Sequence, residues 1–81
     1  ALDNNKGNFL SEGDIYFAFD KGVTNSTGEI QSTKTISIET KEAKVDNISG
    51  GNISADGNVT INSGEFKNNA SYIASKDKLD I

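Results

Sequence analysis

The chain has 81 residues, carries a net charge of −4, and is only 33% hydrophobic. A chain of this length forms at most one small domain with a modest core. The absence of cysteine excludes a disulfide framework and thiolate metal sites, and the absence of histidine removes the commonest general base and metal ligand. All eight basic residues are lysines, so no arginine can form forked contacts with phosphate, and we expect no nucleic acid partner.

The first residues, ALDNNKGNFL, contain neither the basic nor the apolar region of a signal peptide. No apolar run approaches the roughly 20 residues needed to cross a membrane. The chain also begins with Ala1 rather than Met. We therefore expect residues 1–81 to be one repeat segment excised from a larger protein, with any export signal lying elsewhere.

A repeat of about 21 residues organises the whole chain. Each copy opens with an apolar residue, a polar residue and an asparagine, and the four copies start at Leu2, Val23, Val45 and Phe66. The copies therefore span about 2–22, 23–44, 45–65 and 66–81. A fixed period above about 20 residues is typical of a solenoid, in which each repeat packs only against its neighbours.

Apolar and polar residues alternate within each copy, as in Ile36-Ser37-Ile38, which is the period of a strand with one buried face. The strand around the opening triplet is expected to be short, and two later strands are well marked. Their apolar columns are Phe9, Ile30, Ile53 and Ile73; then Ile15, Ile36, Val59 and Leu79; then Phe17, Ile38, Ile61 and Ile81. Two residues after the first of these columns stands a small one, Ser11, Ser32, Ala55 and Ser75.

Glycines beside Asn, Asp or Lys separate the strands and suit corners of the backbone. One length change, an extra residue in the third copy, falls at Gly50-Gly51, where a turn can absorb it. Only Lys41–Lys44 offers a short helical alternative. The sequence therefore predicts an all-β fold, a right-handed parallel β-helix of about four coils, with the handedness taken from the general rule for parallel crossovers.

The most regular polar feature is the asparagine column, formed by Asn4, Asn25, Asn47 and Asn68. We interpret it as a structural ladder in which the amides bond to one another and to the backbone, because buried polar groups need partners. A row of ligand-binding side chains is the alternative. The repetition of one residue type in every coil favours structure.

Aromatic residues cluster in the first copy, where Phe17 belongs to an inward column. Phe19 lies beyond the shared pattern, so it could face outward and form a candidate adhesive patch with Tyr16. Packing against a neighbouring coil is the favoured alternative for these side chains.

Carboxylates are the only candidates for catalysis, and the repeat does not gather them. Acid/base chemistry needs convergent groups, so we expect no enzyme. Asp14 aligns with Thr35, Asn58 and Lys78, and Glu12 aligns with Thr33, Asp56 and Lys76. The stretch GGNISADGN lacks the alternating Gly and Asp of calcium-binding repeats, so we expect no metal site and no cofactor.

The repeat, most complete from Val45 to Ile61, resembles those of filamentous haemagglutinin-like exoproteins, which Gram-negative bacteria secrete by the two-partner route. The resemblance covers essentially the whole chain and is weakest in the second copy, which is rich in Lys and Glu and carries Lys34 where the first and third copies have glycine. It implies a segment of a long β-helical stalk at the bacterial surface, where it contributes to adhesion or displays a growth-inhibiting toxin, as in contact-dependent inhibition. A lack of cysteine suits a chain that crosses a periplasm and an outer membrane unfolded, because no disulfide can form too early.

The partners implied by this resemblance are neighbouring coils of the parent protein, an outer-membrane transporter during secretion, and a receptor on host or bacterial cells. A carbohydrate-active β-helical enzyme and a stand-alone ligand-binding module are the alternative functions. Solenoids need caps on their terminal repeats, so the isolated segment is also expected to stack end to end.

Overall fold

The computed structural model describes residues 1–81, which form twelve short strands and no helix. The structure contains no helix that is long and apolar enough to cross a membrane. The strands are β1 (Leu2–Asp3), β2 (Asn8–Ser11), β3 (Ile15–Ala18), β4 (Val23–Ser26), β5 (Glu29–Ser32), β6 (Ile36–Glu39), β7 (Lys44–Ile48), β8 (Asn52–Ala55), β9 (Val59–Asn62), β10 (Glu65–Asn69), β11 (Tyr72–Ser75) and β12 (Leu79–Asp80).

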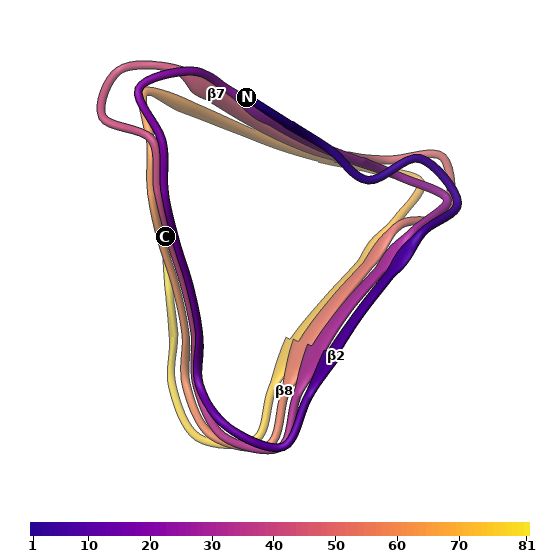
Figure 1. Ribbon diagram of the computed structural model, residues 1–81, viewed down its shortest axis with the longest axis vertical. Helices are drawn as coiled ribbons and strands as arrows, with labels where there is room; N and C mark the ends of the chain where they lie inside the picture. Colours follow the sequence, from indigo (N-terminus) through magenta and orange to yellow (C-terminus); the bar gives the residue numbers. More distant parts are fainter.

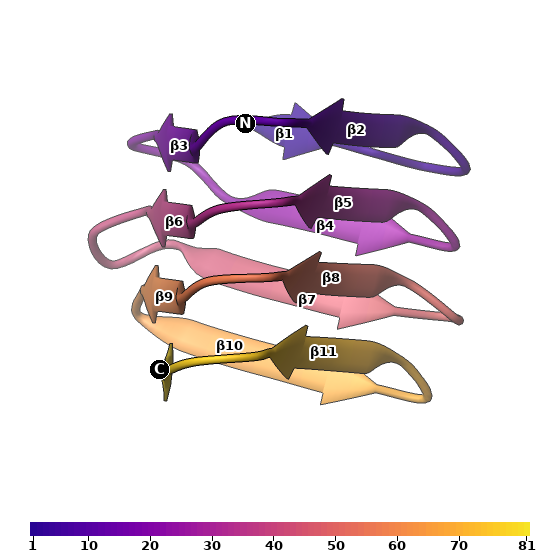
Figure 2. The same ribbon diagram turned by 90° about the horizontal axis from the view of Figure 1, so that it is seen from below.

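The strands form three parallel sheets that are the sides of a triangular tube (Figure 1). The first sheet has the order β1-β4-β7-β10, the second β2-β5-β8-β11, and the third β3-β6-β9-β12. Each coil contributes one strand to each sheet, and the four coils stack with the N-terminus at one end and the C-terminus at the other (Figure 2). The two views together show a right-handed winding, so the predicted parallel β-helix is confirmed.

The register aligns the repeat column by column. Val45 pairs with Val23 on one side and with Phe66 on the other, and Ile53 pairs with Ile30 and Ile73 in the same way. Side chains in one column are thus about one strand spacing apart, roughly 4.8 Å. Because strand side chains alternate between the two faces, a slip of one residue would turn every inward side chain to solvent, which fixes this register.

The first sheet differs from the expectation of a short strand. β4 has four residues, and β7 and β10 have five each, so this side of the triangle is as regular as the others in three of the four coils. Its second inward position is an asparagine, Asn25 in β4 and Asn47 in β7. Each strand of this sheet therefore has only one apolar inward residue, so the alternation of apolar and polar residues underestimated the length of the strand.

Coil length varies at two corners. The extra residue at Ser49-Gly50-Gly51 lies between the first and second sheets. The corner between the third and first sheets also varies, because four residues (19–22) separate β3 from β4, four (40–43) separate β6 from β7, and two (63–64) separate β9 from β10. The sequence analysis therefore identified the length change at Gly50-Gly51 but missed the variation at this second corner. The segment Lys41–Lys44 is no helix, because residues 41–43 belong to the protruding corner seen in Figure 1 and Lys44 begins β7.

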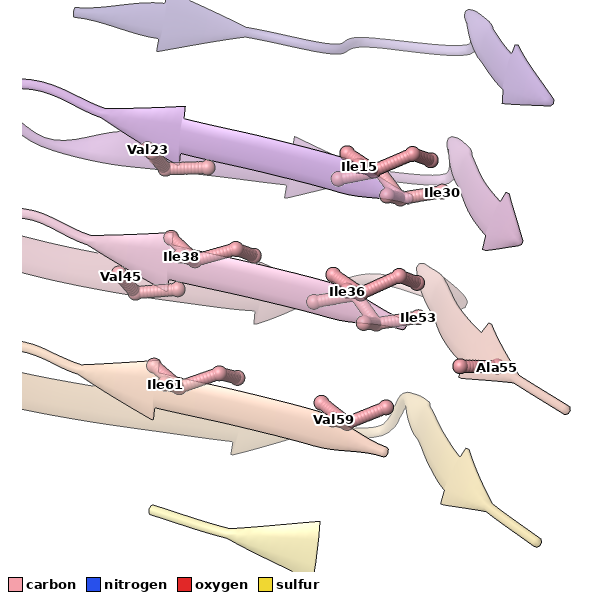
Figure 3. Packing of buried hydrophobic residues seen from close by; sticks show 10 residues of the cluster. All are labelled: Ile15, Val23, Ile30, Ile36, Ile38, Val45, Ile53, Ala55, Val59 and Ile61. Carbon is pink, nitrogen blue, oxygen red and sulfur yellow. The ribbon is translucent and has the colours of Figure 1, made fainter. Parts of the chain in front are cut away.

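The core is a set of apolar ladders inside the tube (Figure 3). Its central members have at most 2% of their surface exposed, and burying each such side chain stabilises the fold by about 1.5–3 kcal/mol. The ten buried residues are Ile15, Val23, Ile30, Ile36, Ile38, Val45, Ile53, Ala55, Val59 and Ile61. Burial is deepest in the two middle coils, since the end coils have a neighbour on one side only.

Candidate functional site

The asparagine column is a continuous hydrogen-bonded ladder inside the corner between the first and second sheets. The Asn4 amide Nδ2 donates to Asn25 Oδ1 at 2.7 Å, Asn25 Nδ2 donates to Asn47 Oδ1 at 2.8 Å, and Asn47 Nδ2 donates to Asn68 Oδ1 at 2.8 Å. Asn25 and Asn47 have no exposed surface, whereas Asn68 at the end of the row is exposed. The ladder thus lies in the interior of the middle coils.

The first three amides of the ladder also bond to the backbone of the second-sheet strand in the next coil. Asn4 Nδ2 donates to the Glu29 carbonyl at 3.2 Å and Asn47 Nδ2 donates to the Tyr72 carbonyl at 2.9 Å, and Asn25 makes the equivalent bond to Asn52. The buried amides therefore have their partners within the fold, which avoids the cost of about 1–3 kcal/mol for an unsatisfied buried group. The geometry favours a structural role for this column over a ligand-binding one.

The backbone of this corner is built around the ladder. In every coil one residue other than glycine adopts a left-handed conformation, with φ between 52° and 62°: Lys6, Thr27, Ser49 and Ala70. In the second coil the position after it must be small. A Cβ atom on Gly28 would lie 2.7 Å from both Asn25 Oδ1 and Asn4 Nδ2, which is far inside contact distance. Glycine is required there because the amide row occupies the space a side chain would fill.

The structure separates the two residues of the candidate adhesive patch. Tyr16 points outward with 66% of its surface exposed. Phe19 packs against the core and stacks on Phe17 with ring centroids 5.8 Å apart, and Phe17 meets Phe9 edge-on at 5.3 Å. The backbone amide of Phe19 bonds to the Glu39 carbonyl, which extends the third sheet's ladder and turns the ring inward. The pair therefore does not form one exposed surface.

A polar groove of about 380 Å³ runs along the outside of the second sheet, where its strands end. It crosses the first three coils and has one hydrophobic residue in its lining. The lining residues are Leu10, Ser11, Glu12, Gln31, Ser32, Thr33, Ser54 and Asp56. None of the asparagine ladder reaches it, because the ladder lies at a different corner.

The carboxylates of the groove do not converge on a common point. Glu12 and Asp56 lie in the same corner column but two coils apart, about 9.6 Å along the tube, with Thr33 between them. The Lys76 ammonium lies 3.6 Å from Asp56. No group of three or more His, Cys, Asp or Glu side chains is arranged to hold a metal ion.

Lys41, in the protruding corner of the second coil, forms an ion pair with Asp20. A hydrogen bond to Asp20 and the charge of the same carboxylate raise the pKa of Lys41 above its ordinary value of 10.5, and the two groups lie 3.0 Å apart. Both side chains are largely exposed, so solvent screens the pair and it contributes little to stability.

A second set of polar partners was missed in the sequence. Serines at the corner between the second and third sheets bond to the backbone, since Ser32 Oγ donates to the Gly13 carbonyl at 2.6 Å and Ser75 Oγ donates to the Gly57 carbonyl at 2.7 Å. Ser11 Oγ accepts from the Gly13 amide at 3.0 Å. The column of small residues is evident in the sequence. Three of its four members are serines, and this preference for a hydroxyl could have indicated hydrogen bonding to the backbone of the corner.

Three unbroken parallel sheets, apolar ladders and an interior amide row define one class of protein, a repeat segment of a right-handed β-solenoid. Comparison with known protein families matches the haemagglutinin repeat over residues 1–18 and 21–81. The chain belongs to the haemagglutinin repeat family, which confirms the resemblance seen in its sequence. This family belongs to secreted bacterial surface proteins. No curated protein and no solved structure matched the chain.

Proposed function

We propose that the chain is a stalk segment of a large adhesin-like exoprotein at the surface of a Gram-negative bacterium. It supplies length and rigidity, and it displays an adhesive or growth-inhibiting activity located elsewhere in that protein. The observation that carries the proposal is the unbroken register of all four coils, because a solenoid of this kind can be extended coil by coil without changing its cross-section.

Secretion by the two-partner route accords with the composition. The chain has no cysteine, so it has no disulfide that could form in the periplasm before passage through an outer-membrane transporter. Its contacts are made within a coil or between adjacent coils, so it can fold progressively as it emerges from the membrane. Contact-dependent inhibition and virulence are roles that such a stalk would serve through its far end.

We propose further that this segment has no enzymatic activity of its own. Acid/base catalysis needs groups that converge on a substrate, and the two carboxylates of the groove, Glu12 and Asp56, stand two coils apart with Lys76 beside one of them. A carbohydrate-active enzyme would be recognised by cleavage of an acidic polysaccharide by the chain, abolished by Glu12→Gln.

The stalk proposal is tested by measuring binding of the labelled chain to host cells and to bacteria over a wide concentration range. A segment that only extends and displays should give no saturable binding. Heat-unfolded chain serves as the control for nonspecific attachment. Saturable binding by the folded chain would contradict the proposal.

The groove on the second sheet is the observation that favours a second candidate, a stand-alone binding module. Its lining offers hydroxyl, amide and carboxylate groups together with the exposed side chain of Leu10. If the folded chain binds cells, Gln31→Ala in the groove should weaken that binding, whereas Ser37→Ala on the outer face of the third sheet should not. That result would favour a binding module over a stalk segment as the function of the chain.

A further inference from the structure

The groove on the outside of the second sheet contains polar side chains that the fold itself does not use. It lies on the side of the tube rather than at either end, and its volume of about 380 Å³ is within the range of small-molecule sites. Gln31 of β5 and Ser54 of β8 are register partners on its surface. The side chains of Gln31, Ser54 and Glu12 make no hydrogen bond or ion pair within the chain, so their polar groups are available to a ligand.

The edge of the groove is held in place by other lining residues. Thr33 Oγ1 donates to the Glu12 carbonyl at 2.9 Å, which ties the corner of the second coil to that of the first. Ser32 Oγ donates to the Gly13 carbonyl at 2.6 Å and accepts from the Lys34 amide at 2.9 Å. The backbone around the groove is thus fixed before a ligand arrives, which lowers the entropic cost of binding.

The available groups have the hydrogen-bonding character that a sugar requires. A carboxylate only accepts, whereas a glutamine amide and a serine hydroxyl both donate and accept, and sugar hydroxyls also do both. Leu10 has 65% of its surface exposed and offers an apolar surface to the carbon face of a sugar ring. The lining therefore combines groups for ring hydroxyls with one group for the ring face.

The charges of the groove favour a neutral ligand over an anionic one. The only charged residues in its lining are Glu12 and Asp56. The Lys76 ammonium lies 3.6 Å from Asp56 and offsets that charge, whereas Glu12 has no such partner. An anionic saccharide would meet the Glu12 carboxylate as a like charge, and this juxtaposition is unfavourable.

The groove repeats its groups along the tube. Leu10, Gln31 and Ser54 are successive register partners, so they are about 4.8 Å apart from coil to coil. Their strands β2, β5 and β8 follow one another along the tube in Figure 2. One ring of an extended oligosaccharide is comparable in length to one such step, so successive rings would meet successive coils.

We propose that this groove binds a neutral, extended oligosaccharide that lies along the tube axis. Gln31 and Ser54 hydrogen-bond to ring hydroxyls, Glu12 accepts from a hydroxyl, and Leu10 covers one ring face. The groove is open to solvent, so the dissociation constant is expected to be of the order of 1 mM.

The inference rests on the groove that favours the second candidate function, the binding module, and extends that candidate by naming the ligand class. It is compatible with the stalk proposal, because a dissociation constant of about 1 mM is too weak to hold the labelled chain on cells.

The proposal is tested by titrating the ¹⁵N-labelled chain with cellotetraose, a neutral extended saccharide, and recording amide chemical shifts by NMR. Shifts should change at Gln31, Thr33 and Ser54, should saturate in the millimolar range, and should not change at Ser37 on the outer face of the third sheet. Gln31→Ala and Ser54→Ala should each weaken binding about fivefold. Ser37→Ala is the matched control and should leave binding unchanged.

Selection by charge is tested with tetragalacturonate, which has the same number of rings and carries a carboxylate on each. It should bind at least about fivefold more weakly than cellotetraose. Glu12→Gln should narrow this difference, because it removes the like charge but keeps the size of the side chain. A residue that only shaped the groove would not change the preference between the two saccharides.

Any of three results would overturn the proposal: no shift changes with cellotetraose up to about 20 mM, equal or tighter binding of tetragalacturonate, or binding that Gln31→Ala and Ser54→Ala leave unchanged. Circular dichroism confirms that each variant is folded before it is titrated. A failed titration leaves the stalk proposal intact, whereas saturable cell binding that Gln31→Ala does not weaken would contradict the stalk proposal without involving the groove.

Discussion

Removing one amide from the middle of the ladder should destabilise the fold far more than removing one from its end. In the folded chain Asn25 Oδ1 accepts from Asn4 at 2.7 Å, and Asn25 Nδ2 donates to Asn47 at 2.8 Å. The change Asn25→Ala removes both of these ladder bonds, together with the longer bonds of Nδ2 to the Gly28 and Asn52 carbonyls. It also leaves Asn47 Oδ1, which belongs to a fully buried residue, without a donor.

The magnitude follows from these contacts. Two hydrogen bonds contribute about 1 kcal/mol each, and an unsatisfied buried acceptor costs about 1–3 kcal/mol, so the loss should be about 3–5 kcal/mol. A chain of this size is stabilised by about 4–12 kcal/mol in total. Asn68→Ala is the matched control, because Asn68 is exposed and Asn47 Nδ2 keeps its bond to the Tyr72 carbonyl. Its loss should be about 1 kcal/mol.

Urea unfolding followed by far-ultraviolet circular dichroism measures both values, provided that the concentration is low enough to keep the chain monomeric. A shift of the midpoint at constant slope reports a change in stability alone. Unfolding of Asn25→Ala without urea would agree with the upper end of the range. Equal losses for the two variants, or a loss below about 1 kcal/mol for Asn25→Ala, would refute the structural role of the ladder.

Two other predictions concern single side chains. Gly28→Ala should lower the free energy of unfolding by about 2–3 kcal/mol and the melting temperature by about 10 °C or more, because its Cβ would overlap the amide row. Gly13→Ala is the control and should change the melting temperature little, because its Cβ would have its nearest neighbour at 3.9 Å. Similar melting curves for the two variants would contradict this account of the corner. Asp20→Asn should return the pKa of Lys41 towards 10.5. Because the folded pKa of Lys41 is raised, the small stabilisation from the pair is present below the unfolded pKa and lost as pH rises through the folded one; an unchanged Lys41 titration by NMR in Asp20→Asn would argue against the pairing.

Most of the fold could be predicted from the sequence because stacked parallel coils impose the same requirement on every repeat. The column of Val23 and Val45, for example, is apolar in all four copies because each member packs between or beside equivalent members. The direction of the amide bonds could not be predicted, since a column of asparagines fits either polarity. It is set by backbone carbonyls, such as that of Glu29, whose positions depend on the folded corner.

The conformation of the corners was less predictable than that of the strands. The aligned apolar columns fix only the strand residues on either side of a corner, and they leave the residues within it free to vary in number and orientation. Thr40 shows the consequence. It is completely buried, and its Oγ1 donates to the Ala43 carbonyl at 3.0 Å, which closes the turn between β6 and β7. Phe19 occupies the equivalent place in the first coil. Its backbone amide bonds to the Glu39 carbonyl, which extends the pairing of the third sheet one residue past the apolar columns, and its ring packs against the core.

The central claim, that coils stack in register as a tube, is tested most directly by cross-linking paired cysteines. Ser37 in β6 and Thr60 in β9 are register partners on the outer face, so Ser37→Cys with Thr60→Cys should form a disulfide efficiently within one molecule at a Cα separation of about 4.8 Å. The chain has no cysteine of its own to compete. Ser37→Cys with Ser54→Cys, which places the second thiol on another side of the triangle, should not cross-link. Failure of the first pair in a folded sample, or equal cross-linking of both pairs, would contradict the stacked coils and the stalk built from them.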